Sequence, residues 1–85
     1  MYYVYILKSL KDNNIYTGYT SNLKLRMEEH QAGQVKSTKD RHPLKLIYFE
    51  AYSSKEDAQK REIYLKSGGK AKNDLKNQIA DSLTI

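Results

Sequence analysis

The stretch YYVYILKSLKDNNIYTGY, residues 2–19, decides the fold because it holds two strand-forming runs joined by a short turn. Tyr2 to Leu7 is a dense run of Tyr, Val, Ile and Leu, and Ile15 to Tyr19 is a second run of the same kind. Lys11 to Asn14, between them, contains Asp and Asn, which tolerate the left-handed backbone of turns. Two strands this close in sequence predict an antiparallel hairpin.

The residues after the hairpin predict a helix, a loop and a third strand. Asn22 to about Gln31 lacks Gly and Pro, so we expect a helix there, capped by Thr20 or Ser21. Gln34 to His42 has little apolar content and is expected to be an exposed loop. Leu44 to Tyr52 is rich in β-forming residues and predicts a third strand.

Two further helices are expected in the C-terminal third. Ser53 with Glu56, or Ser54 with Asp57, forms a capping box that begins a helix reaching about Lys66. Ser67-Gly68-Gly69 ends it, and a weaker helix is expected over Lys70 to Ala80. The order β-β-α-β-α-α predicts an α+β fold, with a small three-stranded antiparallel sheet flanked by helices.

Length and composition limit the class of protein. A chain of 85 residues has room for one hydrophobic core, so residues 1–85 are expected to form a single domain. The absence of cysteine excludes disulfides and cysteine-bound metals. No apolar run of about 18 residues would span a membrane, and the N-terminus lacks the features of a secretion signal. These observations favour the cytoplasm and no membrane association.

The net charge of +5 favours a polyanionic partner such as nucleic acid, although a positive charge also serves solubility. The basic residues fall into two groups, which on folding would line one groove along a phosphate backbone. One group lies in or beside the expected loop and the other in the last third of the chain: Lys36, Lys39, Arg41 and Lys45, and Lys60, Arg61, Lys66, Lys70, Lys72 and Lys76.

Two pairs of side chains stand out as candidate functional groups. Tyr5 and Tyr16 lie near each other across the predicted hairpin, although tyrosine is also an ordinary strand residue. Arg26 and His30 are four residues apart, on a strip beside the face of Leu23 and Met27, and both side chains reach a phosphate from there. The alternative for Arg26 and His30 is a solvated helix face.

Glu62 is a carboxylate in an inward-facing position. It follows Ala58 by four residues and precedes Leu65 by three, which places it on the apolar stripe of the predicted helix. A buried charge is costly unless it is paired or binds a metal. Glu62 is therefore either the partner of a nearby Lys or Arg or a metal ligand, and Mg²⁺ often uses only one or two carboxylates.

In this order and spacing, these residues resemble the GIY-YIG endonuclease superfamily over nearly the whole chain. Its two signature tripeptides correspond to Tyr3-Val4-Tyr5 and Tyr16-Thr17-Gly18, with Tyr3 where the family name has Gly. The two tyrosines are eleven residues apart, Arg26 follows ten residues later, and His30 four after that. Glu62 matches the family's metal-binding glutamate.

The stretch Gly33 to Glu50 is similar to the short stand-alone bacterial branch of this superfamily. That branch is related to the N-terminal domain of the excision-repair incision subunit and to Slx-type nucleases. The resemblance implies a metal-dependent endonuclease that cleaves DNA, structure-selectively and in repair or recombination. RNA remains open as a substrate, as do the oligomeric state and a protein partner that supplies specificity.

The resemblance also implies roles for individual residues. Glu62 would bind Mg²⁺ or Mn²⁺, Arg26 would offset charge on the phosphoryl oxygens, and Tyr5 and Tyr16 would position the attacking water. Either a tyrosine or His30 would be the base. Contacts with the nucleic acid are expected from Lys36, Lys39, Arg41, Lys60, Arg61 and Lys66. The alternatives are a non-catalytic nucleic-acid-binding module of the same fold, and an interaction adaptor whose charge serves solubility.

Overall fold

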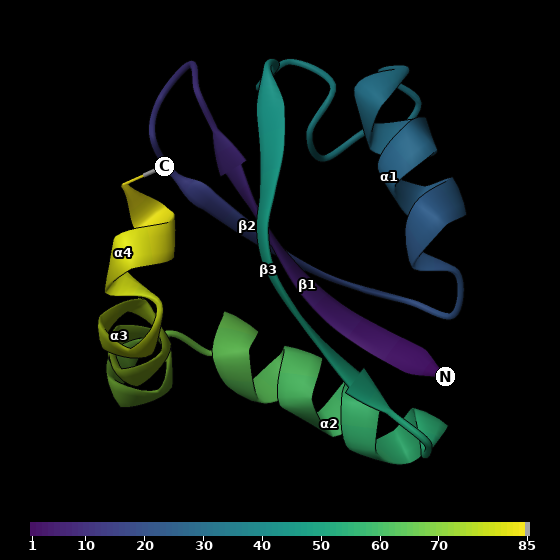
Figure 1. The fold of residues 1–85 in the computed structure, drawn as a ribbon, viewed down its shortest axis with the longest axis vertical. Helices are drawn as coiled ribbons and strands as arrows, with labels where there is room; N and C mark the ends of the chain where they lie inside the picture. The colour runs from purple at the N-terminus through teal and green to yellow at the C-terminus, as the bar shows by residue number, and fades with distance from the viewer. Residues whose placement is uncertain (85) are drawn as a thin grey trace.

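A computed structural model describes residues 1–84, and at its centre lies a three-stranded antiparallel sheet with strand order β2-β1-β3. Strand β1 spans Tyr2–Ser9, β2 spans Ile15–Thr20 and β3 spans Leu44–Tyr52. Figure 1 shows β1 in the middle of the sheet, and it pairs with β2 on one side and β3 on the other. The hairpin and the third strand predicted from sequence are therefore confirmed.

Within the described residues, four helices cover the sheet. Helix α1 spans Leu23–Gln31, α2 spans Lys55–Lys66, α3 spans Gly69–Gln78 and α4 spans Ala80–Leu83. Figure 1 shows α1 apart from the other three, which lie along the opposite part of the molecule. The α+β fold is confirmed. Within residues 1–84, no helix has the length and apolar character needed to cross a membrane.

Each face of the sheet has its own small core. Side chains alternate along β1, so Tyr5 and Leu7 point to one face while Val4 and Ile6 point to the other. The first face packs against Leu23 and Met27 of α1. The second face is larger and packs against the three later helices through Ala58, Leu65, Leu75 and Ile79.

The structure corrects three expectations about the segments between these elements. The N-cap of α1 is Asn22, whose side chain accepts from the backbone N–H of Leu25, rather than Thr20 or Ser21. The loop before β3 is not wholly exposed, because its two buried side chains, Val35 and Thr38, fold back against the core. The single helix predicted over Lys70 to Ala80 is two helices in the structure, because the backbone of Ile79 departs from helical geometry between α3 and α4.

Helix α2 is attached to β3 by a polar cluster. Arg61 donates two hydrogen bonds to Glu50, at 2.9 and 3.0 Å, and Tyr48 and Tyr52 also donate to this carboxylate. Burial raises the pKa of Glu50, but the hydrogen bonds from Arg61 and the two tyrosines outweigh it and hold the pKa below its usual value. This bidentate pair fixes the position of α2, and therefore of Glu62, which follows Arg61.

Candidate active site

A column of three buried polar side chains links β1, α1 and the following loop. Tyr5 Oη lies 2.8 Å from His30 Nε2, and His30 Nδ1 lies 2.7 Å from Thr38 Oγ1. All three residues are at most 1% exposed. A buried polar group without a partner is costly, so this chain of hydrogen bonds satisfies both nitrogens of His30 and fixes its ring orientation.

Burial shifts the titration of two members of this column. It raises the pKa of Tyr5 to about 12, although the nearby Arg26 guanidinium acts in the opposite direction. Burial, together with the charge of Arg26, lowers the pKa of His30 to about 4. His30 is therefore a neutral imidazole at neutral pH, with one ring nitrogen donating a hydrogen bond and the other accepting one.

Tyr16 lies beside the column and is only half-buried. Its ring centroid is 6.4 Å from that of Tyr5 and 5.5 Å from that of His30. Lys66 Nζ lies 5.8 Å from the Tyr16 centroid and 2.9 Å from Glu62 Oε2. The side chains of Glu62 and Lys66 are 21% and 49% exposed, so both are reachable from solvent.

Arg26 is the second cation of this site. Its guanidinium contacts Glu29 at 3.2 Å, and the two side chains are 35% and 36% exposed. An exposed ion pair of this kind is weak, typically below about 1 kcal/mol. Arg26 is therefore free to exchange the Glu29 carboxylate for a phosphate oxygen, and its proximity to Tyr5 keeps it next to the column.

Gly18 makes room for the Tyr5 ring. The two residues are direct partners across the hairpin. A Cβ atom added at Gly18 would lie 2.3 Å from Tyr5 Cζ and Oη, which is far inside van der Waals contact. The tyrosine of β1 therefore lies flat over a position of β2 that has no side chain, and only glycine permits this approach.

Comparison with known proteins places this arrangement in a family. Residues 1–76 match the family described as the GIY-YIG catalytic domain. The chain belongs to the GIY-YIG family. A UPF0213 protein of Clostridium perfringens is 45% identical over 86 aligned positions, covering 100% of this chain and 88% of the relative. A UPF0213 protein of Staphylococcus haemolyticus is 49% identical over 67 positions, covering 78% of this chain and 80% of the relative.

A solved structure supports the same conclusion. The solution NMR structure of a UPF0213 protein from Bacillus halodurans is 36% identical and covers 93% of this chain and 85% of its own. Its TM-score is 0.57, so the GIY-YIG fold is common to both. The chain is thus similar to short bacterial members of the family. The two signature tripeptides lie side by side on β1 and β2, where Tyr5 faces Gly18 and Leu7 faces Tyr16.

The structure separates the basic residues that were expected to contact nucleic acid. Lys66 lies at the site, and Lys36 and Lys39 are exposed on either side of Thr38. Lys60 is exposed on α2. Two other basic side chains are engaged elsewhere, since Arg61 binds Glu50 and Arg41 pairs with Asp12 at 3.6 Å. The single basic groove expected from sequence therefore lacks these two guanidinium groups.

Thr38 and Gly18 are parts of the site that the sequence did not reveal as functional groups. Thr38 lies in a charged stretch that predicted an exposed loop, and its only signal was the apolar Val35 three residues earlier. Backbone hydrogen bonds from Thr38 and Lys39 to the Val35 carbonyl form the turn that carries the Thr38 hydroxyl inward. Tyr19, Tyr48 and Tyr52 are partly buried and pack against the larger core.

Replacing Gly18 by alanine is expected to destabilise the protein by about 1–3 kcal/mol, because the new methyl group would collide with Tyr5. Urea unfolding measures the effect. The matched control is the same substitution in a Tyr5→Leu background, where the smaller side chain leaves space and the cost should be much lower. An equal cost in both backgrounds would show that this contact is not the cause.

Stability is expected to fall between pH 6.5 and about 4 because of His30. The pKa of His30 is lowered to about 4 in the folded protein, whereas an unfolded histidine has its ordinary pKa of 6.5. Between these pH values His30 is protonated in the unfolded chain but not in the folded chain, so acid favours unfolding by on the order of 2 kcal/mol. Urea unfolding from pH 7 to 4.5 should show a smaller slope in His30→Gln. An identical slope in that variant would contradict the assignment.

Proposed function

We propose that this GIY-YIG protein is a metal-dependent endonuclease that hydrolyses phosphodiester bonds in DNA. The observation that supports this best is that side chains suited to catalysis, and reachable from solvent, lie around the rigid, buried column. A hydroxyl, a carboxylate and two cations are available there: Tyr16, Glu62, Arg26 and Lys66. Tyr5, His30 and Thr38 lie beneath them and are closed to substrate.

The two tyrosines differ in burial, and we assign them different roles. Tyr5 is 0% exposed, so we assign it to positioning: its hydroxyl holds His30 and its ring supports Tyr16. Tyr16 is half-buried and meets the attacking water. Lys66 lies over the Tyr16 ring, 5.8 Å from its centroid. The Tyr16 hydroxyl accepts a hydrogen bond from the attacking water and positions it.

His30 acts as a positioning residue rather than as the base. Both of its ring nitrogens are engaged, by Tyr5 and by Thr38, and it is 1% exposed. Its pKa of about 4 also disfavours proton uptake at neutral pH. The sequence left either a tyrosine or His30 as the base, and these contacts favour a positioning role for His30.

Arg26 and Lys66 bind the substrate phosphate. Each is paired with a carboxylate in the free protein, Arg26 with Glu29 and Lys66 with Glu62, and both pairs are partly exposed. An incoming phosphate competes with these carboxylates at small cost. Donors already in place where charge develops on the phosphoryl oxygens stabilise the transition state more than the ground state.

Glu62 is the residue that would hold the divalent cation, Mg²⁺ or Mn²⁺. It is a partly buried carboxylate paired with Lys66, whose ammonium group lies over the Tyr16 ring. Among residues 1–84, no group of three or more His, Asp or Glu side chains forms a metal cage. This fits Mg²⁺, which commonly uses one carboxylate and completes its shell with water and substrate phosphate. When bound, the cation supplies Lewis-acid stabilisation of the phosphate and leaving oxygens.

The experiment that tests this proposal exposes several nucleic acids to the purified protein. Branched, nicked, single-stranded and duplex DNA, and the corresponding RNA, are incubated with Mg²⁺, Mn²⁺ or EDTA. We expect cleavage of DNA only with metal, and faster cleavage of branched or nicked DNA, in keeping with a role in repair or recombination. Binding without cleavage under all conditions would replace the nuclease with a nucleic-acid-binding module of the same fold.

A further inference from the structure

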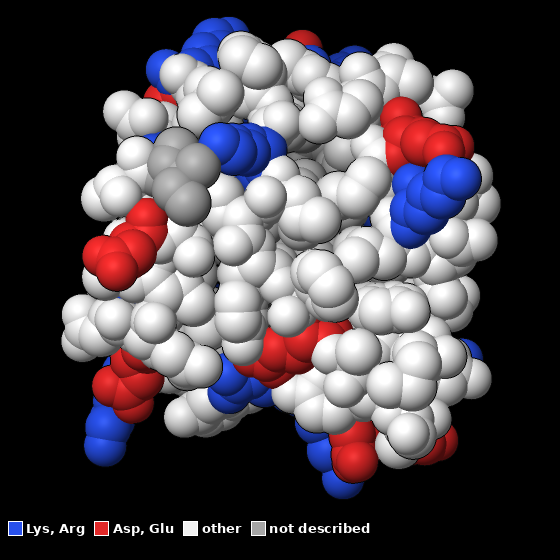
Figure 2. All heavy atoms as spheres, viewed as in Figure 1, with Lys and Arg blue, Asp and Glu red and all other residues white. Residues whose placement is uncertain are grey.

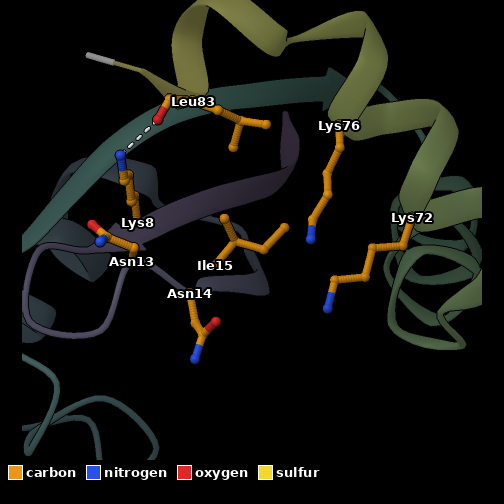
Figure 3. A pocket seen from close by; sticks show the side chains of 7 residues that line it. All are labelled: Lys8, Asn13, Asn14, Ile15, Lys72, Lys76 and Leu83. Carbon is orange, nitrogen blue, oxygen red and sulfur yellow. Dashed lines mark hydrogen bonds between the residues drawn. The ribbon is translucent and has the colours of Figure 1, made fainter.

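A second polar hollow lies on the other face of the hairpin from Tyr5. It is a cavity of about 240 Å³ between the β1–β2 turn and the last helices. Three lysines line it, Lys8 from β1 and Lys72 and Lys76 from α3, together with Asn13 and Asn14 of the turn. Figure 3 shows Lys72 and Lys76 reaching from α3 toward the hairpin, with Lys8 beyond them.

The fold itself brings these lysines together. Lys8 shares the face of Val4 and Ile6, on which α3 packs. Lys72 and Lys76 are four residues apart and lie on the same side of α3. The ammonium group of Lys8 donates to the Leu83 carbonyl at 2.6 Å, so it is held in place at the cavity. The sequence placed Lys72 and Lys76 in a general basic groove, whereas the structure groups them with Lys8 at one cavity.

The electrostatics of this cavity favour an anion. Like charges four apart on a helix repel each other, and a third cation in the same hollow adds to the repulsion. Among residues 1–84, no carboxylate lies within salt-bridge distance of Lys8, Lys72 or Lys76. On the face that Figure 2 shows, acidic and basic side chains are interspersed. The three lysines at this cavity form a local group of one sign.

The position of the cavity relates it to the candidate active site. Ile15 lines the cavity and Tyr16 belongs to the site, because the side chains of consecutive residues of β2 point to opposite faces of the sheet. Lys66 ends α2 at the site, and Lys72 lies in the helix that follows. Because β2 is an edge strand, no further strand of residues 1–84 lies between the cavity and the site on that side.

We propose that this cavity, the Lys8–Lys72–Lys76 pocket, binds a backbone phosphate of the nucleic-acid strand that extends from the scissile bond around the β2 edge. The inference rests on the proposed nuclease function. Lysine ammonium groups are strong phosphate binders that act as point charges, and the two asparagine amides add neutral donors. The pocket carries no sequence information and instead fixes the register of the strand.

Binding of a single-stranded oligonucleotide in EDTA, where cleavage is stopped, tests this proposal. The variant is Lys72→Gln/Lys76→Gln, and the matched control is Lys24→Gln/Lys55→Gln, which removes the same charge from exposed positions on α1 and α2. We expect about 10-fold weaker binding in the pocket variant than in the control at about 0.1 M salt. The salt slope should also fall by about 0.7 for one lost phosphate contact.

The outcomes separate this inference from the proposed function. Equal affinity and salt slope in the two variants, while the wild type binds and cleaves DNA, would overturn the pocket alone. A wild type that neither binds nor cleaves any nucleic acid would overturn the function and the pocket's role with it. In the last experiment, the protein is titrated with inorganic phosphate and followed by NMR. If the amide signals of the pocket residues show that inorganic phosphate binds as tightly as the oligonucleotide, the pocket is a site for free anions. That result would contradict strand binding.

Discussion

Replacing Glu62 by glutamine is expected to abolish metal-dependent cleavage while leaving the fold intact. The substitution keeps the size of the side chain but removes the charge that would hold the cation. Loss of the Lewis acid at the phosphate is expected to slow turnover roughly 1000-fold, or about 4 kcal/mol of transition-state stabilisation. Stability should change by less than about 0.5 kcal/mol, because the partly exposed Glu62–Lys66 pair contributes little.

Binding measurements distinguish this loss from a failure to bind DNA. The variant removes a negative charge near the phosphate and releases Lys66, so its DNA affinity should be equal to or higher than that of the wild type. Glu28→Gln is the matched control, since Glu28 is an exposed carboxylate on α1. It should retain full activity. Full cleavage by Glu62→Gln would remove the metal assignment.

Replacing Arg26 by alanine is expected to lower kcat roughly 100-fold while weakening DNA binding only a few-fold. The reason is that charge on the phosphoryl oxygens grows in the transition state, so the guanidinium contact strengthens there. In the free protein Arg26 makes a partly exposed pair with Glu29 and lies near Tyr5, and its removal should leave the fold unchanged. Single-turnover kinetics and equilibrium binding separate the two effects.

Two companion variants make the Arg26 result interpretable. Lys24→Ala removes the same charge from the same helix at an exposed position, and we expect its kcat to match the wild type. Glu29→Gln, added to Arg26→Ala, tests whether the unpaired carboxylate left behind, rather than the missing guanidinium, repels the DNA. If Arg26→Ala lost binding and turnover in equal measure, Arg26 would serve ground-state affinity and not the transition state.

Local patterns in the sequence predicted the secondary structure well where a single rule governs it. The β-forming runs on either side of an Asp/Asn turn gave the hairpin, and Leu44–Tyr52 was predicted with the bounds that the structure has. Ser54, one of two caps considered, accepts from the backbone N–H of Asp57 and begins α2. These features depend on residues a few positions apart, so neighbours in sequence determine them.

Partners of charged side chains were not predictable in the same way. Glu62 was expected to be either an ion-pair partner or a metal ligand, and the structure pairs it with Lys66 four residues later. Arg61 was expected at the nucleic acid, but Glu50, eleven residues earlier on β3, binds its guanidinium. Which carboxylate meets which cation depends on how α2 packs on the sheet, and no local rule fixes that packing.

The sequence by itself determined the order of the strands and helices, the membership of the tyrosines, Arg26, His30 and Glu62 in one family pattern, and the positive charge. Only the tertiary structure decided that Tyr5 is buried and Tyr16 reachable, because both are tyrosines on adjacent strands with equal propensity. It also brought Thr38 under His30 and gathered Lys8, Lys72 and Lys76 around one cavity. Burial and proximity between residues far apart in sequence arise from packing, which local patterns do not encode.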